Sequence, residues 1–242
     1  MENDILKSFD IQKELNPKIW ENGDKPKMKP EIRERLLEIA NEYLEFLDVE
    51  IVITDIVLTG SLANYNWSKY SDFDLHIVAN FNQYPQNQVE LYEKLFNLKK
   101  MIFKDKHDIK IKNYDVELYV ENESEEHFSS GVYSILFDDW AMTPKKENIK
   151  IDKKLLKDRS SQWMKTIDEL LDSLEDENVQ TAKRILEKYK DKIKKFRSAG
   201  LGKNGEHSTE NLVFKILRRN GYIEKLYKRG NEIIDKKLSM NQ

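Results

Sequence analysis

One segment constrains the fold of this chain more than any other, the sequence DFDLHIVANF at residues 72–81. Side chains of a β-strand alternate between its two faces. One face of this segment carries three apolar residues, Phe73, Leu75 and Ile77. The other face carries three polar residues, Asp72, Asp74 and His76. We therefore predict a strand that packs one face on a core and presents two carboxylates on the other, with His76 as an ordinary hydrogen-bonded residue at the strand end.

Further strands and helices flank this segment on both sides. The sequence VEIVITDIVLTG at 49–60 is rich in β-branched residues and stops at a glycine, which is typical of a strand that ends in a turn. The sequence YDVELYVE at 114–121 alternates again, and GVYSILF at 131–137 predicts one further strand. Apolar residues recur at helical spacing over 31–47 and 88–103. Together these patterns predict a mixed sheet with flanking helices.

The remaining parts of the chain differ from this central region. Residues 1–30 suit an irregular arm that is anchored by Trp20. From about residue 150 onward the apolar spacing is helical, and one of the helices is expected over 209–219. We therefore predict an α+β fold in two domains, an α/β domain at 1–148 with its N-terminal arm and helix, and an α-helical domain at 149–242.

Composition excludes several classes of site. The 242 residues contain no cysteine, which rules out disulfides, thiolate catalysis and Cys-ligated zinc or iron–sulfur centres. The chain is 35% charged and 39% hydrophobic, as expected for a folded protein with a well solvated surface. No apolar run approaches the ~18 residues of a membrane span, and the first residues lack the pattern of a targeting peptide. We expect a soluble cytoplasmic protein with no membrane partner.

Asp72 and Asp74 have a spacing that suits metal ions. Carboxylates at i and i+2 of a strand point to the same side, and hard oxygen ligands suit Mg²⁺ or Mn²⁺. A carboxylate from a neighbouring strand would complete a site for two ions about 3.5–4 Å apart, which stabilise both oxygens in a nucleotidyl transfer. Asp115 and Glu117 share the polar face of the strand at 114–121, so either could serve. We expect Glu117, because apolar residues flank it on both sides.

A Gly-Ser turn precedes the two aspartates. Gly60 and Ser61 stand where the first strand passes into LANYNW at 62–67, which predicts a helix. Backbone N–H groups at a helix N-terminus and a serine hydroxyl can hold phosphate oxygens, and glycine lets a ligand approach the backbone closely. The turn therefore predicts a nucleotide-binding element made of Gly60 and Ser61.

This combination resembles a known superfamily. Gly60-Ser61, ten intervening residues, Asp72 and Asp74 separated by one residue, and a carboxylate on a later strand resemble the polymerase-β-like nucleotidyltransferases. The resemblance covers roughly residues 50–121. The wider pattern, including GSLANYNWSKYSDFDLH and ENLVFKILRRNGYIEKL, is similar to uncharacterised predicted nucleotidyltransferases of large tailed phages, for which the location would be the host cytoplasm.

The resemblance implies a fold and a role for each matching residue. It implies a nucleotidyltransferase-type mixed β-sheet flanked by helices, with Ser61 on the nucleotide phosphates and with Asp72 and Asp74 on two Mg²⁺ ions. The third carboxylate, Glu117, would assist deprotonation of the attacking hydroxyl. Many relatives have aspartate as the third acid, so this chain departs from the common pattern at that position.

The resemblance also implies a reaction. The enzyme would transfer a nucleoside monophosphate from an NTP, with ATP as the expected donor, to a hydroxyl group and release pyrophosphate. The acceptor stays open between a small molecule, a protein side chain and an RNA 3′ end, so a nucleic-acid partner is open as well. The alternative is a non-catalytic nucleotide-sensing or protein-binding module on the same fold, whose expected mark is loss of a metal ligand or of the Gly-Ser turn.

One helical segment is strongly basic. Between Lys183 and Arg197 the chain has eight lysines and arginines against two acids. We interpret it as a solvated helix face, with binding of a triphosphate or an RNA backbone as the alternative. Residues 200–205 have the glycine spacing G-x-G-x-x-G, but a basic helix precedes them where a dinucleotide site needs a strand. We predict a hinge there, from which Lys203 or Arg197 would reach the nucleotide.

Overall fold

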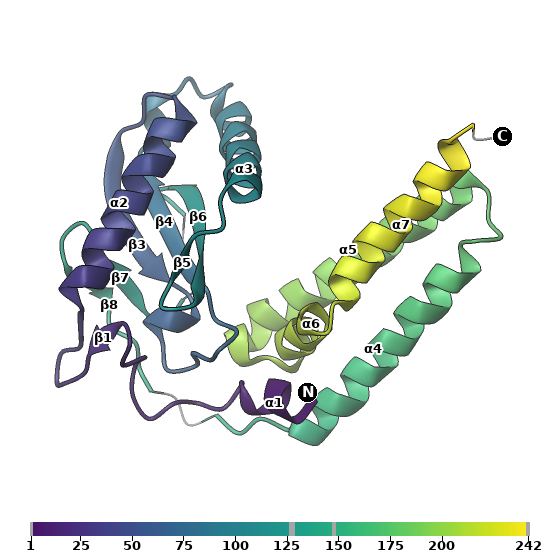
Figure 1. The fold of residues 1–242 in the computed structure, drawn as a ribbon, viewed down its shortest axis with the longest axis horizontal. Coiled ribbons are helices and arrows are strands. Elements are labelled where there is room, and N and C mark those ends of the chain that lie inside the picture. The colour runs from purple at the N-terminus through teal and green to yellow at the C-terminus, as the bar shows by residue number, and fades with distance from the viewer. Residues whose placement is uncertain (1, 126–128, 147–148, 241–242) are drawn as a thin grey trace. The chain divides into compact units, whose positions relative to one another are not determined.

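The computed structural model describes residues 2–125, 129–146 and 149–240, which form two compact units (Figure 1). The sheet unit comprises residues 10–148, and the helical unit comprises residues 149–242 together with residues 1–9. The first nine residues join the helical unit because Arg219 holds them. Its guanidinium donates a 2.6 Å hydrogen bond to Ser8 Oγ and lies 4.8 Å from the ring centroid of Phe9.

The sheet unit is built on a six-stranded mixed sheet with the order β5-β6-β4-β3-β7-β8. The strands are β3 (Ile53–Thr59), β4 (Phe73–Ala79), β5 (Lys110–Ile111), β6 (Tyr114–Asn122), β7 (Val132–Ser134) and β8 (Asp139–Met142). The central pair β4 and β6 is parallel, and the other neighbours in this sheet are antiparallel. The predicted α+β class and mixed sheet are confirmed.

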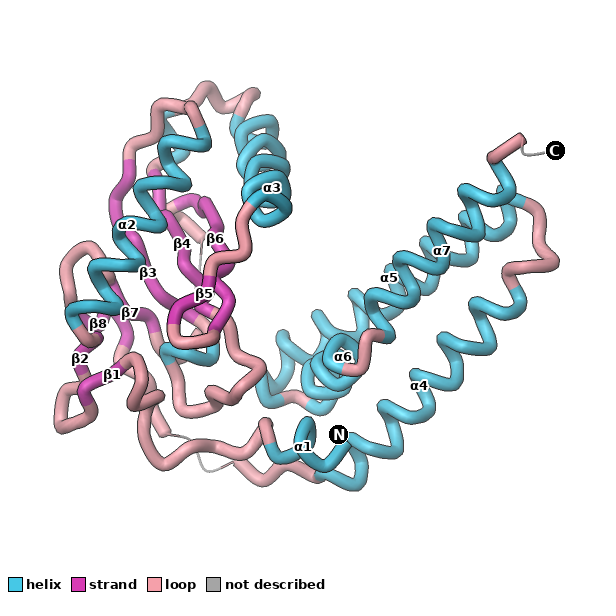
Figure 2. Tube along the Cα trace, in the orientation of Figure 1, coloured by secondary structure: helices cyan, strands magenta, loops and turns pink. Residues whose placement is uncertain are grey.

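Two helices cover one face of this sheet, α2 (Pro30–Leu47) and α3 (Val89–Lys106), as Figure 2 shows. Pro30 suits the first turn of α2, where its missing N–H costs nothing. The buried stripe of α2 is the one that the apolar spacing predicts, Ile32, Leu36, Ile39, Ala40, Tyr43 and Leu47. It packs in one core cluster with the fully buried Phe73, Leu75 and Ile77 of β4. Each such side chain contributes about 1.5–3 kcal/mol on burial, so the polar face of β4 is forced to the opposite side.

The N-terminal arm is anchored by Trp20, as predicted, but it is more regular than the sequence suggests. It forms a two-stranded sheet from β1 (Trp20–Glu21) and β2 (Lys27–Met28). The indole of Trp20 is 1% exposed, donates from Nε1 to the carbonyl of Leu62 at 2.8 Å, and stacks on Trp140 at 4.7 Å. The strand predicted over 131–137 is only β7, and β8 follows it after a turn and pairs with it in the antiparallel direction.

The helical unit contains the short helix α1 (Glu2–Lys7) and the longer helices α4 (Lys153–Ser173), α5 (Val179–Asn204), α6 (Thr209–Arg219) and α7 (Tyr222–Leu238). The bounds of α6 agree with the predicted 209–219, and Ser208 Oγ caps it by accepting from Asn211 N at 3.3 Å. No helix in the described part of the chain is long and apolar enough to cross a membrane.

The hinge predicted at 200–205 is wrong in most of its length. Helix α5 continues through Gly200 and the following residues to Asn204, and the helical path changes only at Gly205, whose φ is +64°. The glycine at 200 has a packing reason. A Cβ added there would lie 2.6 Å from the Cβ of Glu210 and 2.6 Å from Ser208 Oγ, so a side chain would separate α5 from the start of α6.

Candidate metal and nucleotide site

Three carboxylates meet on the polar face of the sheet. Asp74 on β4 stands directly opposite Glu117 on β6 in the parallel ladder, and Asp72 lies two residues earlier, just before β4. One carboxylate oxygen from each of Asp72, Asp74 and Glu117 lies within 4.8 Å of the other two, and all three residues are half-buried. Strand alternation fixes the face, and the register of β4 with β6 fixes the distance. The donor set is three hard oxygens, which suits a divalent cation such as Mg²⁺ or Mn²⁺.

The structure distinguishes the two acids that the sequence leaves open. Asp115 lies opposite Lys110 of β5, and its carboxylate is 3.2 Å from Lys110 Nζ. The side chain of Asp115 is 65% exposed, against 22% for Glu117. Glu117 is the one that completes the cluster with Asp72 and Asp74.

Glu117 is held by two donors. Lys104 of α3 donates to its Oε1, and the hydroxyl of Tyr119 donates to its Oε2 at 2.7 Å. Burial disfavours the charged carboxylate, but the hydrogen bonds from Lys104 and Tyr119 outweigh burial, so the pKa of Glu117 lies below its usual value. Glu117 is therefore ionised at neutral pH.

A second lysine of α3 lies beside the same strand. Lys100 Nζ is 3.1 Å from the ring centroid of Tyr119, a cation–π contact. Burial lowers the pKa of Lys100, and attraction to Glu117, Asp74 and Asp72 opposes that effect. Burial and the same carboxylates raise the pKa of the Tyr119 hydroxyl, so Tyr119 stays a neutral donor. Lys100 and Lys104 bring positive charge to the edge of the acid cluster.

Gly60 lies against the carboxylate of Asp74. Its φ is +72° and its ψ is −160°, a conformation that side-chain-bearing residues rarely adopt. A Cβ at this position would lie 1.9 Å from Asp74 Oδ2. The backbone of the Gly-Ser turn therefore approaches the carboxylate more closely than any other residue type would permit.

The segment after Gly60 differs from the predicted helix. It is a single 3₁₀ turn, η1 (Ser61–Ala63), which ends when the chain becomes extended at Asn64. The side chain of Asn64 donates to the carbonyl of Gly60 at 3.0 Å, and this local bond competes with helical continuation. Ser61 Oγ donates to Ser71 Oγ at 2.7 Å, which ties the turn to the residue before Asp72.

The remaining predicted residues fall outside the cluster. His76 is hydrogen-bonded as expected, since its Nδ1 lies 2.6 Å from Glu121 Oε2, and its ring stacks on Tyr119 at 4.5 Å. Arg197 belongs to the helical unit, where its Nε donates to Asn211 Oδ1 at 3.2 Å. Lys203 lies in α5, and its side chain is outside the described part of the structure. Nucleotide binding by Arg197 and Lys203 stays a prediction.

Sequence reasoning missed three residues of this site, Tyr119, Lys100 and Lys104. A signal for Tyr119 was available, because alternation places it on the same face as Glu117. The two lysines are spaced i and i+4 on one side of α3, which shows that they share a face. Nothing local in the sequence shows that this face lies beside β6.

Comparison with known proteins addresses the central part of the chain. Residues 33–138 match a family model described as a nucleotidyltransferase domain. The match contains the Gly-Ser turn and all three acids of the cluster. Neither the curated proteins nor the solved structures gave a match. The narrower resemblance to phage proteins stays a prediction. The match over residues 33–138, with Gly60-Ser61 set against Asp72, Asp74 and Glu117, supports the predicted polymerase-β-like nucleotidyltransferase superfamily for this part of the chain.

Proposed function

We propose that this protein is a metal-dependent nucleotidyltransferase that transfers a nucleoside monophosphate from an NTP, with ATP as donor, to a hydroxyl acceptor. The observation that carries the proposal is the convergence of Asp72, Asp74 and Glu117, with Asp74 and Glu117 in register on parallel strands. Two like charges 4 Å apart repel by about 1 kcal/mol in water and about 4 kcal/mol at an effective dielectric constant of 20. A cation at the cluster relieves this repulsion.

Asp72, Asp74 and Glu117 would supply the oxygen ligands for Mg²⁺ or Mn²⁺, and the proposed mechanism uses two such ions. When bound, such ions neutralise charge on the attacking and leaving oxygens of an in-line displacement. The acceptor oxygen forms a bond to the α-phosphorus while the bond from that phosphorus to the bridging oxygen breaks. The hydroxyl proton passes to a carboxylate or to solvent, and pyrophosphate leaves.

Glu117 serves better as a ligand than as a proton acceptor in this scheme. A general base works best when its pKa lies near the working pH, whereas Lys104 and Tyr119 hold the pKa of Glu117 below its usual value. Its role is then to orient a cation and the acceptor hydroxyl. In the absence of a divalent ion, Lys104 supplies the positive charge at Glu117.

Gly60 and Ser61 hold the triphosphate in this proposal. Gly60 allows the backbone of the turn to lie close to Asp74, because a side chain at this position would overlap the Asp74 carboxylate. The Ser61 hydroxyl, which donates to Ser71 in the unliganded protein, would redirect its proton to a phosphate oxygen when the nucleotide binds. Since η1 is only one turn long, individual N–H groups and the hydroxyl carry this interaction, and a helix dipole adds little.

The direct test is product analysis. Purified protein is incubated with Mn²⁺, each of the four NTPs and a cell extract as acceptor source, and mass spectrometry detects an acceptor heavier by one NMP. Pyrophosphate release is measured in parallel. Asp74→Asn serves as the matched inactive variant, because it keeps the side-chain volume and removes a charged ligand. Nucleotide binding without any Asp74-dependent pyrophosphate would show a binding module and overturn the enzyme assignment.

A further inference from the structure

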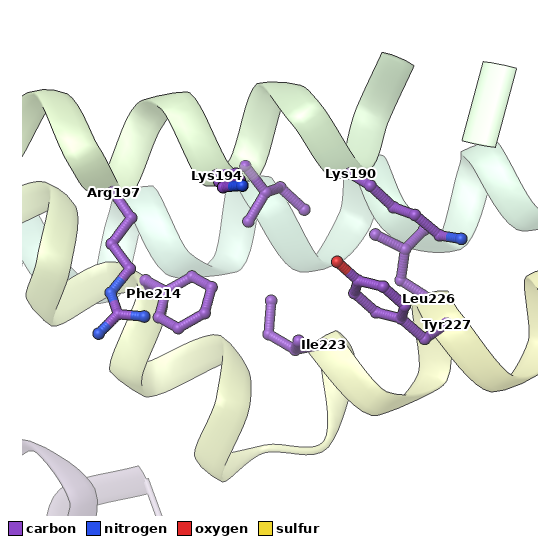
Figure 3. A pocket seen from close by; sticks show the side chains of 8 residues that line it. Lys190, Lys194, Arg197, Phe214, Ile223, Leu226 and Tyr227 are labelled. Carbon is purple, nitrogen blue, oxygen red and sulfur yellow. The ribbon is translucent and has the colours of Figure 1, made fainter. Parts of the chain in front are cut away.

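The helical unit contains a concave site that the proposed function does not use. A cavity of about 130 Å³ opens between α5, α6 and α7 (Figure 3). Its floor is apolar, made of Ile193, Ile223 and Leu226. Its remaining lining is three cations and two aromatic rings, Lys190, Lys194, Arg197, Phe214 and Tyr227. A hollow with an apolar floor and a cationic rim favours a ligand that is both flat and anionic.

The cations continue along α5 beyond this cavity. Lys183, Lys190, Lys194 and Arg197, here called the α5 stripe, are spaced by seven, four and three residues and so lie on one face of the helix. At 1.5 Å per residue they span about 21 Å, the length of about six stacked nucleotides at ~3.4 Å each. Glu187 lies on the same face and pairs with Lys190 at 3.1 Å, so it neutralises part of the stripe.

More positive charge gathers where the stripe ends. Lys215 of α6 lies near Arg197, Arg218 and Arg219, with Glu206 as the opposing charge. Burial lowers the pKa of Lys215, and the three arginines lower it further. Arg197, Arg218 and Arg219 bring positive charge to this end of the stripe, although the whole chain has a net charge of −3.

The aromatic rings are placed for stacking beside these charges. Tyr227 is 47% exposed, and Lys190 Nζ lies 4.8 Å from its ring centroid. At the other end of the cavity Arg197 lies 4.6 Å from the ring centroid of Phe214. Figure 3 shows these two cation–aromatic pairs at opposite ends of the apolar floor. Proteins use an exposed ring next to a line of cations, such as Tyr227 here, to hold unpaired bases and their phosphates.

We propose that the α5 stripe and its cavity bind single-stranded nucleic acid, with backbone phosphates on the lysines and arginine and a base on Tyr227. The chemistry of the site favours this occupant over an acidic peptide, because a peptide carboxylate offers no flat ring for Tyr227. If this surface binds the acceptor of the proposed transfer reaction, that acceptor is a polynucleotide. This step rests on the proposed function.

The binding test needs no catalysis. Fluorescence anisotropy of labelled 12-nucleotide oligouridine RNA and oligothymidine DNA is measured with the full chain in EDTA and without NTP. Four phosphate contacts predict a slope of log K against log salt of about −2.8, which is about 50-fold weaker binding at 200 mM than at 50 mM salt. Binding of either strand supports the proposal, and tighter binding of RNA identifies RNA as the preferred acceptor.

Matched variants locate the surface. Lys190→Gln with Lys194→Gln is expected to reduce the salt slope by about 1.4, from two lost phosphate contacts. Lys188→Gln with Lys195→Gln makes the same charge change on exposed positions of the same helix that do not line the cavity, and it is expected to leave the slope unchanged. Tyr227→Ala is expected to weaken binding by at least about fivefold, and Tyr227→Phe is expected to retain it.

Two results would overturn the proposal. One is equal weakening by both double variants, which would mean that only the general charge of α5 matters. The other is displacement of the oligonucleotide by a poly-glutamate peptide of the same charge as efficiently as by unlabelled RNA. Asp74→Asn is expected to bind the oligonucleotide normally, so that failure of this surface and failure of the proposed chemistry give different results.

Discussion

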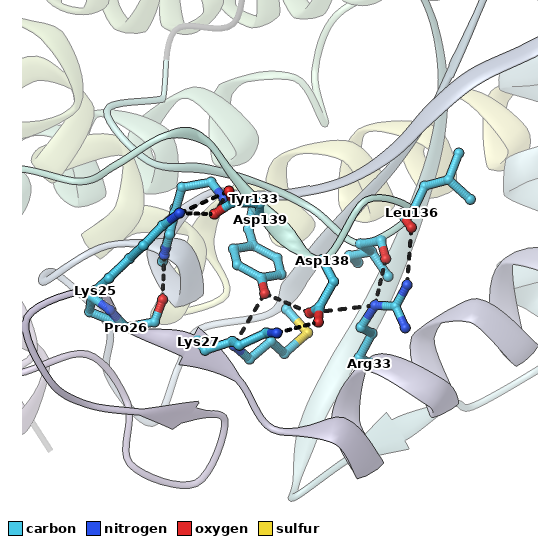
Figure 4. A network of polar contacts seen from close by, with 11 residues as sticks. Lys25, Pro26, Lys27, Arg33, Tyr133, Leu136, Asp138 and Asp139 are labelled. Atoms are coloured by element: carbon cyan, nitrogen blue, oxygen red, sulfur yellow. Dashed lines mark hydrogen bonds and ion pairs between the residues drawn. The ribbon is translucent and has the colours of Figure 1, made fainter.

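Two groups of charged residues in the sheet unit differ in the charges that surround their carboxylates. Around Asp138, in the turn between β7 and β8, one carboxylate is met by several donors (Figure 4). Tyr133 donates to it at 2.7 Å, Lys27 pairs with it at 2.8 Å, and Arg33 lies at 3.5 Å. In the acid cluster three carboxylates are brought towards one another. The first arrangement neutralises charge, and the second concentrates it.

The difference separates a structural site from the proposed functional one. The donors around Asp138 join the N-terminal arm, α2 and the β7–β8 turn, because Arg33 also donates to the carbonyls of Ile135 and Leu136 at 2.8 and 3.0 Å. Such bonds stabilise the fold without any ligand. The carboxylates of the acid cluster repel one another, and a bound cation would relieve that repulsion. Substitution of Asp138 should therefore change stability, and substitution in the acid cluster should change activity.

The largest expected effect is on turnover at the cluster. Glu117→Gln is expected to reduce pyrophosphate release about 1000-fold, since a bound metal contributes several kcal/mol to the transition state and 1.36 kcal/mol is tenfold. Mn²⁺ should raise the thermal midpoint of the wild type more than that of the variant. Asp115→Asn is the control and is expected to stay within twofold of wild type. Comparable losses in both variants would refute the assignment of Glu117.

Gly60→Ala is expected to affect both turnover and stability. The new Cβ would displace Asp74, and the positive φ would add about 1–3 kcal/mol of strain. We expect about 100-fold lower turnover and a lower midpoint of thermal unfolding. Gly23→Ala provides the comparison, because nothing lies within 4 Å of a Cβ at that position. Normal activity of Gly60→Ala would show that the turn and Asp74 are not coupled.

Asp138→Asn tests the structural side of the comparison. Asparagine tolerates the φ of +57° at this position but loses the ion pairs, so we expect about 1–2 kcal/mol of destabilisation and unchanged turnover. Burial raises the pKa of Asp138, but the hydrogen bonds from Lys27 and Tyr133 lower it by a larger amount. The pKa of Asp138 in the folded protein therefore lies below its ordinary value. The stabilisation is therefore present above about pH 4 and is lost as the pH falls through the folded pKa.

Denaturant unfolding at several pH values measures this effect. The gap in unfolding free energy between wild type and Asp138→Asn should be constant near neutral pH and should close in acid. The neighbouring Asp139→Asn is expected to leave the unfolding free energy close to that of the wild type, because the Lys25–Asp139 pair is largely exposed. A gap that widens in acid would mean that folding raises the pKa of Asp138, which is the opposite of the expected direction.

The smallest expected effect concerns Lys104. Its pair with Glu117 competes with a cation, so Lys104→Gln is expected to bind Mn²⁺ about two- to fivefold more tightly in the absence of nucleotide. The effect is small because the lysine is 63% exposed. Lys94→Gln is the matched control on α3, since Lys94 is 71% exposed and pairs within its own helix, with Glu90. Calorimetric titration with Mn²⁺ measures both, and weaker binding by Lys104→Gln would mean that the lysine supports the metal site.

Local patterns predict much of this protein. The alternation of DFDLHIVANF placed Asp72 and Asp74 on the face opposite the core, and the same rule placed Glu117 and Tyr119 on the polar face of β6. Helical spacing predicted α2 and its buried stripe, and cap residues predicted α6. These predictions succeed because face and cap depend on a few neighbouring residues.

Local patterns fail where a side-chain bond or a second element alters the backbone path. The helix predicted after Gly60 is one turn, because Asn64 bonds back to the glycine carbonyl. Residues 200–204 of the predicted hinge are helical, and Gly200 has a packing role there because it allows α6 to approach α5. The strand predicted over 131–137 ends early, at Ser134, and β8 begins only after the Asp138 turn, which contacts the distant Lys27 and Arg33.

By itself the sequence determined which residues share a face, since side-chain direction follows from the backbone period of each element. The tertiary structure decided that β6 runs parallel to β4 with Glu117 opposite Asp74, that Asp115 turns to Lys110, and that α3 brings Lys104 to the cluster. Strand partner and register are set by packing between segments far apart in the chain. A short stretch of sequence shows the side-chain period of one helix or strand, but it does not contain the partner strand and so cannot show the register.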